Sequence, residues 1–256
     1  MAWPAPEGVP ARPGLRATRP VQLGLLGGFE LSVDGARIDV PASAERVVAY
    51  LGLHTRSQPR SLVARSLWSR HPEQRAVANL RSAIWKLRGV RDLVVEPRAD
   101  RLGLAAGVVV DVTVLVGRAR RVIECARGTV DAAVPAPADL VDALSLDVLP
   151  DWDEDWVIFE RERIRQLRIH AMEALSSQLR TQRRYGEAID AGLAAVAADP
   201  LRESAQRVLI EAHLAEGNTV DARRQFETYR ELLWDGIEVL PSPWLTELVE
   251  RGSAGG

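Results

Sequence analysis

The sequence is poor in the residues and patterns that several large protein classes require. Its single cysteine, Cys125, excludes a disulfide framework and a zinc site with several cysteines, and indicates a reducing compartment. The best candidate for a membrane span, AAGVVVDVTVLVG, is interrupted by Asp111 and is shorter than the roughly 20 apolar residues that a span needs. The first 20 residues lack the apolar core of a signal peptide. We therefore expect a cytoplasmic protein without membrane contact.

Patterns for catalysis, metal binding and cofactor binding are also missing. The four histidines are scattered along the chain without metal-ligand spacing. The glycines at positions 24, 27 and 28 match neither a phosphate-binding loop nor a dinucleotide fingerprint. Nothing resembles an activated nucleophile. We therefore expect no catalytic residues, no metal and no cofactor, and do not expect an enzyme.

One acidic segment matches part of a calcium-binding loop. Asp151, Asp153, Asp155 and Glu162 occupy positions 1, 3, 5 and 12 of an EF-hand loop, but Trp156 stands at position 6, where the sharp turn needs glycine. The acidic residues are better explained as caps and dipole partners of a helix that begins near Asp153 or Asp155.

Lysine is almost absent, and charge is unevenly distributed. Lys86 is the only lysine among 33 basic residues. Residues 21–110 hold 13 basic and 8 acidic side chains, whereas residues 111–256 hold 17 basic and 26 acidic side chains. The first segment suits a polyanionic partner, and the second suits a protein partner.

Residues 21–110 predict a sheet, three helices and a hairpin, in that order. Residues 21–40 contain short apolar runs broken by glycine turns, which predicts a small antiparallel sheet. Helices are then predicted from Ser43, the expected N-cap, to Leu53, over residues 61–68, and over residues 77–88. The stretch from Leu93 to Val112 predicts two strands joined by a turn near residues 97–101. This is the order of a winged helix with an N-terminal sheet.

The third predicted helix, within VANLRSAIWKLRG, has an apolar stripe and an opposite polar stripe. The apolar stripe contains Val77, Leu80, Ile84 and Leu87, with Ala76 and Ala83 at its edge. The residues expected to contact bases are Gln74, Arg75, Asn79, Ser82 and Lys86, flanked by Arg81 and Trp85. Arginine, lysine, asparagine and glutamine are the side chains that pair with guanine and adenine edges.

Further arginines are expected to contact the DNA backbone. They are Arg60, Arg65, Arg70, Arg81, Arg98 and Arg101, and the last two lie in the predicted hairpin turn. Phosphate contacts of this kind position a protein without selecting a sequence. A basic amphipathic helix is also a common solvated surface, so the pattern alone leaves both interpretations open.

The second half predicts consecutive amphipathic helices. One helix is expected from Tyr185 to about Ala198, and Pro200 is expected to open the next. Leu175 and Leu209 lie 34 residues apart, which is the tetratricopeptide (TPR) period. We therefore expect a short TPR-like array whose groove accepts a partner.

Several stretches resemble a known family of regulators. LLGGFELSVDG, LVARSLW and ANLRSAIWKLR resemble the OmpR-type winged helix of the SARP (antibiotic regulatory protein) activators. LPDWDEDWVIFERERIRQLRIHAMEALSSQL and DPLRESAQRVLIEAHLAEGN resemble the bacterial transcriptional activator domain of the same family. The resemblance implies a nucleoid-associated activator that binds double-stranded promoter DNA at direct repeats, as a dimer on DNA. It also implies recruitment of RNA polymerase through its sigma factor, to a biosynthetic gene cluster for an antibiotic or other secondary metabolite.

The expected fold class is an α+β winged helix-turn-helix domain followed by an all-α TPR-like domain. The expected boundaries are a disordered arm at residues 1–20, the DNA-binding domain at 21–110, the TPR-like activator domain at 111–250 and a flexible tail at 251–256. The alternative is a TPR-type adaptor or ligand-sensing scaffold without specific DNA binding. Trp152 and Trp156 are expected to be apolar anchors of the helical domain.

Overall fold

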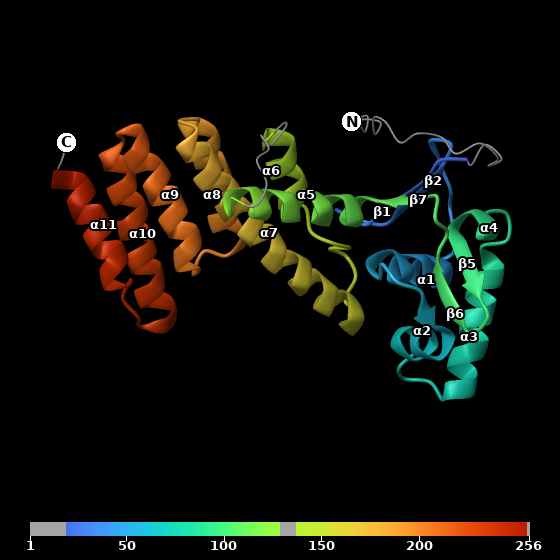
Figure 1. Cartoon of the computed structure of the whole chain (residues 1–256). Coiled ribbons are helices and arrows are strands. Elements are labelled where there is room, and N and C mark those ends of the chain that lie inside the picture. Colours follow the sequence, from blue (N-terminus) through green and yellow to red (C-terminus); the bar gives the residue numbers. More distant parts are fainter. Residues whose placement is uncertain (1–18, 129–136, 255–256) are drawn as a thin grey trace.

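The computed structural model describes residues 19–128 and 137–254. A part that contains the strands lies at one end, and a row of helices extends away from it to the C-terminus (Figure 1). Residues 1–18 of the expected arm and residues 255–256 of the expected tail lie outside the described ranges.

The first sheet has four short strands, one of which comes from a distant part of the chain. The strands are β1 (Val21–Gly24), β2 (Glu30–Val33), β3 (Ala36–Arg37) and β7 (Val108–Val110). Their order is β3-β2-β1-β7. The first three are antiparallel, as predicted, but β7 runs parallel to β1, so the sheet is mixed. A parallel partner requires a long connection, which here contains the helices and the hairpin.

Three helices fill that connection. They are α1 (Ala42–Leu53), α2 (Arg60–Leu67) and α3 (Glu73–Lys86). The expectation that Ser43 caps α1 is wrong: Pro41 is the N-cap residue, and Ser43 already lies in the first turn. The extended backbone of Pro41, with φ of −64° and ψ of 146°, allows the helix to begin at Ala42. α1 is buried from Val47 to Leu53 and forms the centre of this part.

The predicted hairpin is present and belongs to a second sheet. A one-turn helix, α4 (Arg91–Val94), leads into β5 (Val95–Arg98) and β6 (Arg101–Leu104), which pair antiparallel. The strand β4 (Gln58–Pro59) adds to β6. The predicted second strand ends at Leu104, because a turn at Ala106 and Gly107 sends the following valines into β7.

Within the described residues, the regular elements of the second half are all helices. Its helices are α5 (Asp111–Ala126), α6 (Pro137–Ser145), α7 (Asp155–Thr181), α8 (Tyr185–Ala198), α9 (Glu203–Glu216), α10 (Thr219–Ile237) and α11 (Pro243–Ala254). From α7 onward each helix packs against the next along the chain (Figure 1). None of the described helices has the length and apolar character needed to cross a membrane.

The predicted helical pattern is largely confirmed in this row. α8 has the predicted bounds, and Ala222, Phe226, Tyr229 and Leu233 share the buried side of α10. The expectation for Pro200 is wrong, because α9 begins at Glu203 after a turn that contains Pro200. α11 continues to Ala254, so it includes the first residues of the segment expected as a tail.

The main core joins the two halves of the chain. Val148, Leu149, Val157 and Ile164 belong to the same buried cluster as α1 and the first sheet. The backbone adds to this contact, since the Leu149 amide donates to the Leu25 carbonyl at 2.9 Å. A second cluster lies among α5 to α9, and a third lies toward α11.

The two tryptophans expected to anchor the helical domain lie at this junction. Trp152 stacks on Phe29, with ring centroids 6.2 Å apart, and Trp156 meets Tyr50 edge-on at 5.3 Å. They therefore anchor the start of α7 against the sheet loop and α1.

Candidate nucleic-acid interface

Helix α3 buries two alanines and two leucines along one side, and this sets its exposed side. The buried side chains are Ala76, Leu80, Ala83 and Leu87. Val77 and Ile84, which belong to the predicted apolar stripe, are only half-buried. Alanines allow the closest approach between helices, so the helix is turned toward them. The most exposed line of α3 consequently runs through Ala78 and Trp85.

The five candidates for base contacts lie on or beside this exposed side. Gln74, Arg75 and Ser82 are exposed, and Asn79 is half-buried. Lys86 is exposed, but its Nζ donates to the Ser43 Oγ in α1 at 3.2 Å. Asn79 lies seven residues before Lys86 and therefore shares its flank of the helix. The structure thus brings all five onto one helix, with Asn79 and Lys86 toward α1.

The six arginines expected at the DNA backbone divide into two groups. Arg65, Arg70, Arg81 and Arg98 are exposed, whereas Arg60 and Arg101 are half-buried. The Arg98 Nη2 pairs with the Glu96 Oε2 at 3.0 Å, across an exposed surface. The Arg101 guanidinium donates to both the hydroxyl and the carbonyl of Ser57, so it holds the hairpin against the start of β4.

Three residues near the end of α3 were not among the candidates. The Trp85 side chain is 59% exposed, and the Arg88 guanidinium lies 4.0 Å from the centroid of its ring. Arg91, at the start of α4, is also exposed. The sequence pattern places Trp85 only at the flank of the polar stripe, whereas a helical wheel centred on Ala76 and Ala83 places it outermost.

The surface around α2, α3 and the hairpin is strongly basic. Residues 56–101 contain 11 basic and 4 acidic side chains. Such an excess produces a positive potential that attracts a polyanion. Shape and charge therefore agree: an exposed polar helix lies beside an exposed hairpin on the basic part of the molecule.

The segment that matches part of an EF-hand enters a helix too early to form that loop. α7 begins at Asp155, so Trp156 at position 6 lies in a helical turn. Within the described ranges, no group of three or more histidine, cysteine, aspartate or glutamate side chains is placed to hold a metal ion.

Charged side chains in the helical row tie neighbouring helices together. The Arg165 Nη1 lies 3.3 Å from the Asp199 Oδ2, and the Arg202 Nε lies 2.8 Å from the Glu173 Oε1. Arg165 also donates to Glu162, which lowers the pKa of that carboxyl to about 2. These pairs explain part of the acidic composition of this half as packing between helices.

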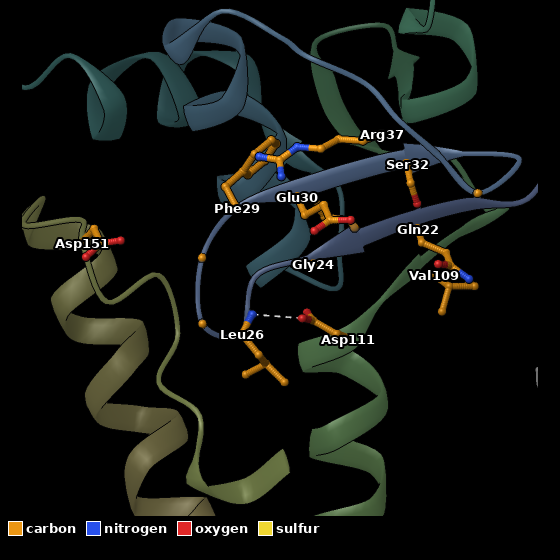
Figure 2. A pocket seen from close by; sticks show the side chains of 14 residues that line it. Gln22, Gly24, Leu26, Phe29, Glu30, Ser32, Arg37, Val109, Asp111 and Asp151 are labelled. Atoms are coloured by element: carbon orange, nitrogen blue, oxygen red, sulfur yellow. Dashed lines mark hydrogen bonds between the residues drawn. The ribbon is translucent and has the colours of Figure 1, made fainter. Parts of the chain in front are cut away.

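A wide cavity of about 710 Å³ lies over the outer face of the first sheet (Figure 2). Asp111, at the start of α5, lines it, and the carboxylate accepts hydrogen bonds from the Leu25 amide at 2.9 Å and the Leu26 amide at 2.9 Å. Burial raises the pKa of Asp111 above its ordinary value, although these hydrogen bonds act in the opposite direction. Asp111 therefore fixes the loop after β1 to α5.

Comparison with known proteins adds to this geometry. The family model of the bacterial transcriptional activator domain matches residues 110–251. The chain is 26% identical over 258 residues to the regulatory protein AfsR of Streptomyces coelicolor, an alignment that covers 94% of this chain and 25% of AfsR. The chain thus spans about a quarter of the length of that relative.

A solved structure supports the same architecture. The structure of Mycobacterium tuberculosis EmbR in complex with a low affinity phosphopeptide is similar, with a TM-score of 0.70 and 20% identity. The similarity covers 92% of this chain and 65% of that chain. A winged helix-turn-helix part followed by a TPR-like helical part is therefore the fold of this protein. The match over residues 110–251, more than half of the chain, establishes the family: the chain belongs to the bacterial transcriptional activator domain family.

Proposed function

We propose that the protein binds promoter DNA in a sequence-specific way and activates transcription there. Residues 21–110 form the DNA-binding part, and residues 111–250 form the part that contacts protein. α3 enters the major groove, where Gln74, Arg75 and Ser82 contact bases, with Asn79 and Lys86 on the flank. The single observation that carries this proposal is the exposed polar side of α3 beside the hairpin, on a surface with 11 basic and 4 acidic side chains.

The remaining steps follow the family. Protomers bind side by side on direct repeats, as a dimer on DNA, and recruit RNA polymerase through its sigma factor. The target is a gene cluster for a secondary metabolite such as an antibiotic, and the protein acts in the cytoplasm at the nucleoid. In this role it is a regulator and not an enzyme.

Genome-wide mapping of bound DNA tests the proposal. The expected result is a repeated sequence upstream of one biosynthetic gene cluster. Affinity for a duplex that carries this sequence should fall steeply with salt, about 10³- to 10⁵-fold between 50 and 200 mM for 6–10 phosphate contacts. An adaptor without specific DNA binding would show neither the repeated sequence nor the steep salt dependence, and that outcome would reject the proposal.

A further inference from the structure

A cleft of about 320 Å³ lies between α3 and the hairpin. Its walls include Ile84 and Trp85 from α3 and Pro97 from β5, and its rim carries Arg60, Arg81 and Arg91. The cleft thus combines an apolar interior with three guanidinium groups.

The three arginines give this cleft an excess of positive charge. Among the described residues, Arg60 and Arg81 have no acidic partner, and the Arg91 Nη2 pairs with the Asp92 Oδ1 at 2.8 Å on an exposed surface. Exposed ion pairs of this kind are weak. Like charges grouped in this way favour an anionic ligand, and phosphate suits arginine best because the guanidinium can donate two parallel hydrogen bonds.

The apolar walls add a second requirement. The Trp85 ring is the largest exposed apolar surface of α3, and its stack with Arg88 restrains its orientation. A simple phosphate ion would leave this surface exposed to water. A ligand that fits both features has anionic groups joined by units with apolar faces, as in the deoxyribose–phosphate chain of DNA.

The geometry of a duplex places such a chain at this position. In a winged helix on DNA, the recognition helix lies in the major groove and the hairpin flanks it. A sugar–phosphate strand forms the edge of the major groove that holds α3. Because the hairpin lies outside that groove, beside its edge, the strand passes between α3 and the hairpin.

We propose that this cleft holds the backbone of one DNA strand, with Trp85 packed on a deoxyribose and with Arg60, Arg81 and Arg91 at the adjoining phosphates. The proposal rests on the proposed function, since it specifies how the DNA-binding part holds its ligand. Trp85 and Arg91 then contribute affinity for any duplex and no choice of sequence.

Equilibrium binding of the full chain to duplex DNA tests the cleft. The variants are Trp85→Ala, Trp85→Phe and Arg91→Gln, and Trp234→Ala is the matched control, since Trp234 is 55% exposed on α10. Trp85→Ala and Arg91→Gln should each bind about 10-fold more weakly, the effect of one charged or well-packed contact. The loss should be equal on the mapped promoter duplex and on an unrelated duplex. Trp85→Phe should retain most of the affinity, and Trp234→Ala should bind normally.

Modified duplexes locate the contact. A single methylphosphonate, placed at each step in turn, removes one phosphate charge and should weaken wild-type binding about 10-fold at the step held by Arg91. Arg91→Gln should show no further loss at that step, because the interaction is already absent. Replacing thymines by uracil should affect the wild type and Trp85→Ala equally, because a sugar contact does not involve the thymine methyl group.

Three results would overturn the inference. Normal binding by both Trp85→Ala and Arg91→Gln would remove the cleft from the DNA interface. If one thymine-to-uracil change weakened binding of the wild type but not of Trp85→Ala, Trp85 would contact that base and not a sugar. If a variant had a melting temperature low enough to account for its weaker binding, the loss of affinity would come from unfolding of the protein and not from a lost DNA contact. If the wild-type chain binds no duplex at all, the proposed function itself fails, which is distinct from failure of the variants alone.

Discussion

At the scale of single residues, Arg75 is the strongest test of base contact. It is exposed on α3 and, among the described residues, forms no ion pair, whereas Lys86 is hydrogen-bonded to Ser43. We expect Arg75→Ala to weaken binding to the mapped promoter by about 1–3 kcal/mol and to relax selectivity at one base position. Anisotropy titrations with single-base variants of the duplex measure both effects.

Arg37→Ala is the matched control for Arg75→Ala, because Arg37 is exposed on β3 in the other sheet. It should bind the promoter normally. An equal loss on every sequence for Arg75→Ala would assign Arg75 to phosphate, and no loss would exclude it from the interface.

Small residues also explain why the exposed side of α3 was only partly predictable. The pattern of Leu80 and Leu87 identifies the buried side correctly. Ala76 and Ala83 carry little weight in a hydrophobicity pattern, yet they are as deeply buried as the two leucines. Trp85 is expected only beside the polar stripe, and in the structure it is 59% exposed. The choice between packed and exposed apolar residues depends on neighbours that are distant in sequence.

At the scale of elements, the helices were predictable because their signals are local. α8 and the buried side of α10 follow from periodicity within one helix. The strand β4 and the pairing of β7 with β1 were not predictable, since each strand has two or three residues and acquires its partner from a distant segment. The valines of β7 have high strand propensity, but nothing local indicates which sheet they join.

Glycines in α8 give a prediction about how the row of helices packs. A Cβ on Gly192 would lie 3.1 Å from the Leu209 Cα of α9, which is closer than ordinary contact, and the partner atom belongs to the backbone. Gly192→Ala should therefore lower the free energy of unfolding by about 1 kcal/mol, because the clash outweighs the gain in helix propensity. The thermal midpoint should fall by about 2–4 °C.

Gly186, in the first turn of the same helix, supplies the control. A Cβ there would meet no atom within 4 Å, so Gly186→Ala should raise the midpoint slightly by restricting the unfolded chain. Equal effects of the two substitutions would show that α8 and α9 do not approach as closely as described.

Asp111 connects two elements and gives a second prediction at this scale. Its carboxylate accepts the amides of Leu25 and Leu26, which lose their partner if the side chain is removed. Asp111→Ala should lower the free energy of unfolding by about 2–4 kcal/mol, the effect of two backbone donors left without a partner. Thermal unfolding measures it, and Asp151→Ala is the control, since Asp151 lines the same cavity and is exposed. A midpoint equal to that of the control would mean that water replaces the carboxylate.

At the scale of the whole molecule, the shared core makes the stability of the winged helix depend on the helical half. Ile164 of α7 is 1% exposed and packs in the cluster that contains α1, whereas Leu245 of α11 is fully buried in the third cluster. Each truncation to alanine removes a large buried side chain and should cost about 2–5 kcal/mol locally. The two variants therefore perturb cores at opposite ends of the molecule by similar amounts.

Hydrogen exchange at the amides of α1 distinguishes their effects. Ile164→Ala should increase exchange there about 30-fold or more, because 2 kcal/mol of lost stability raises the open population by that factor. Leu245→Ala should leave α1 unchanged and increase exchange in α10 and α11. If both variants changed α1 equally, the chain would unfold as one unit. If neither did, the winged helix would be stable on its own, and the contact across residues 148–164 would not couple the stability of the winged helix to that of the helical half.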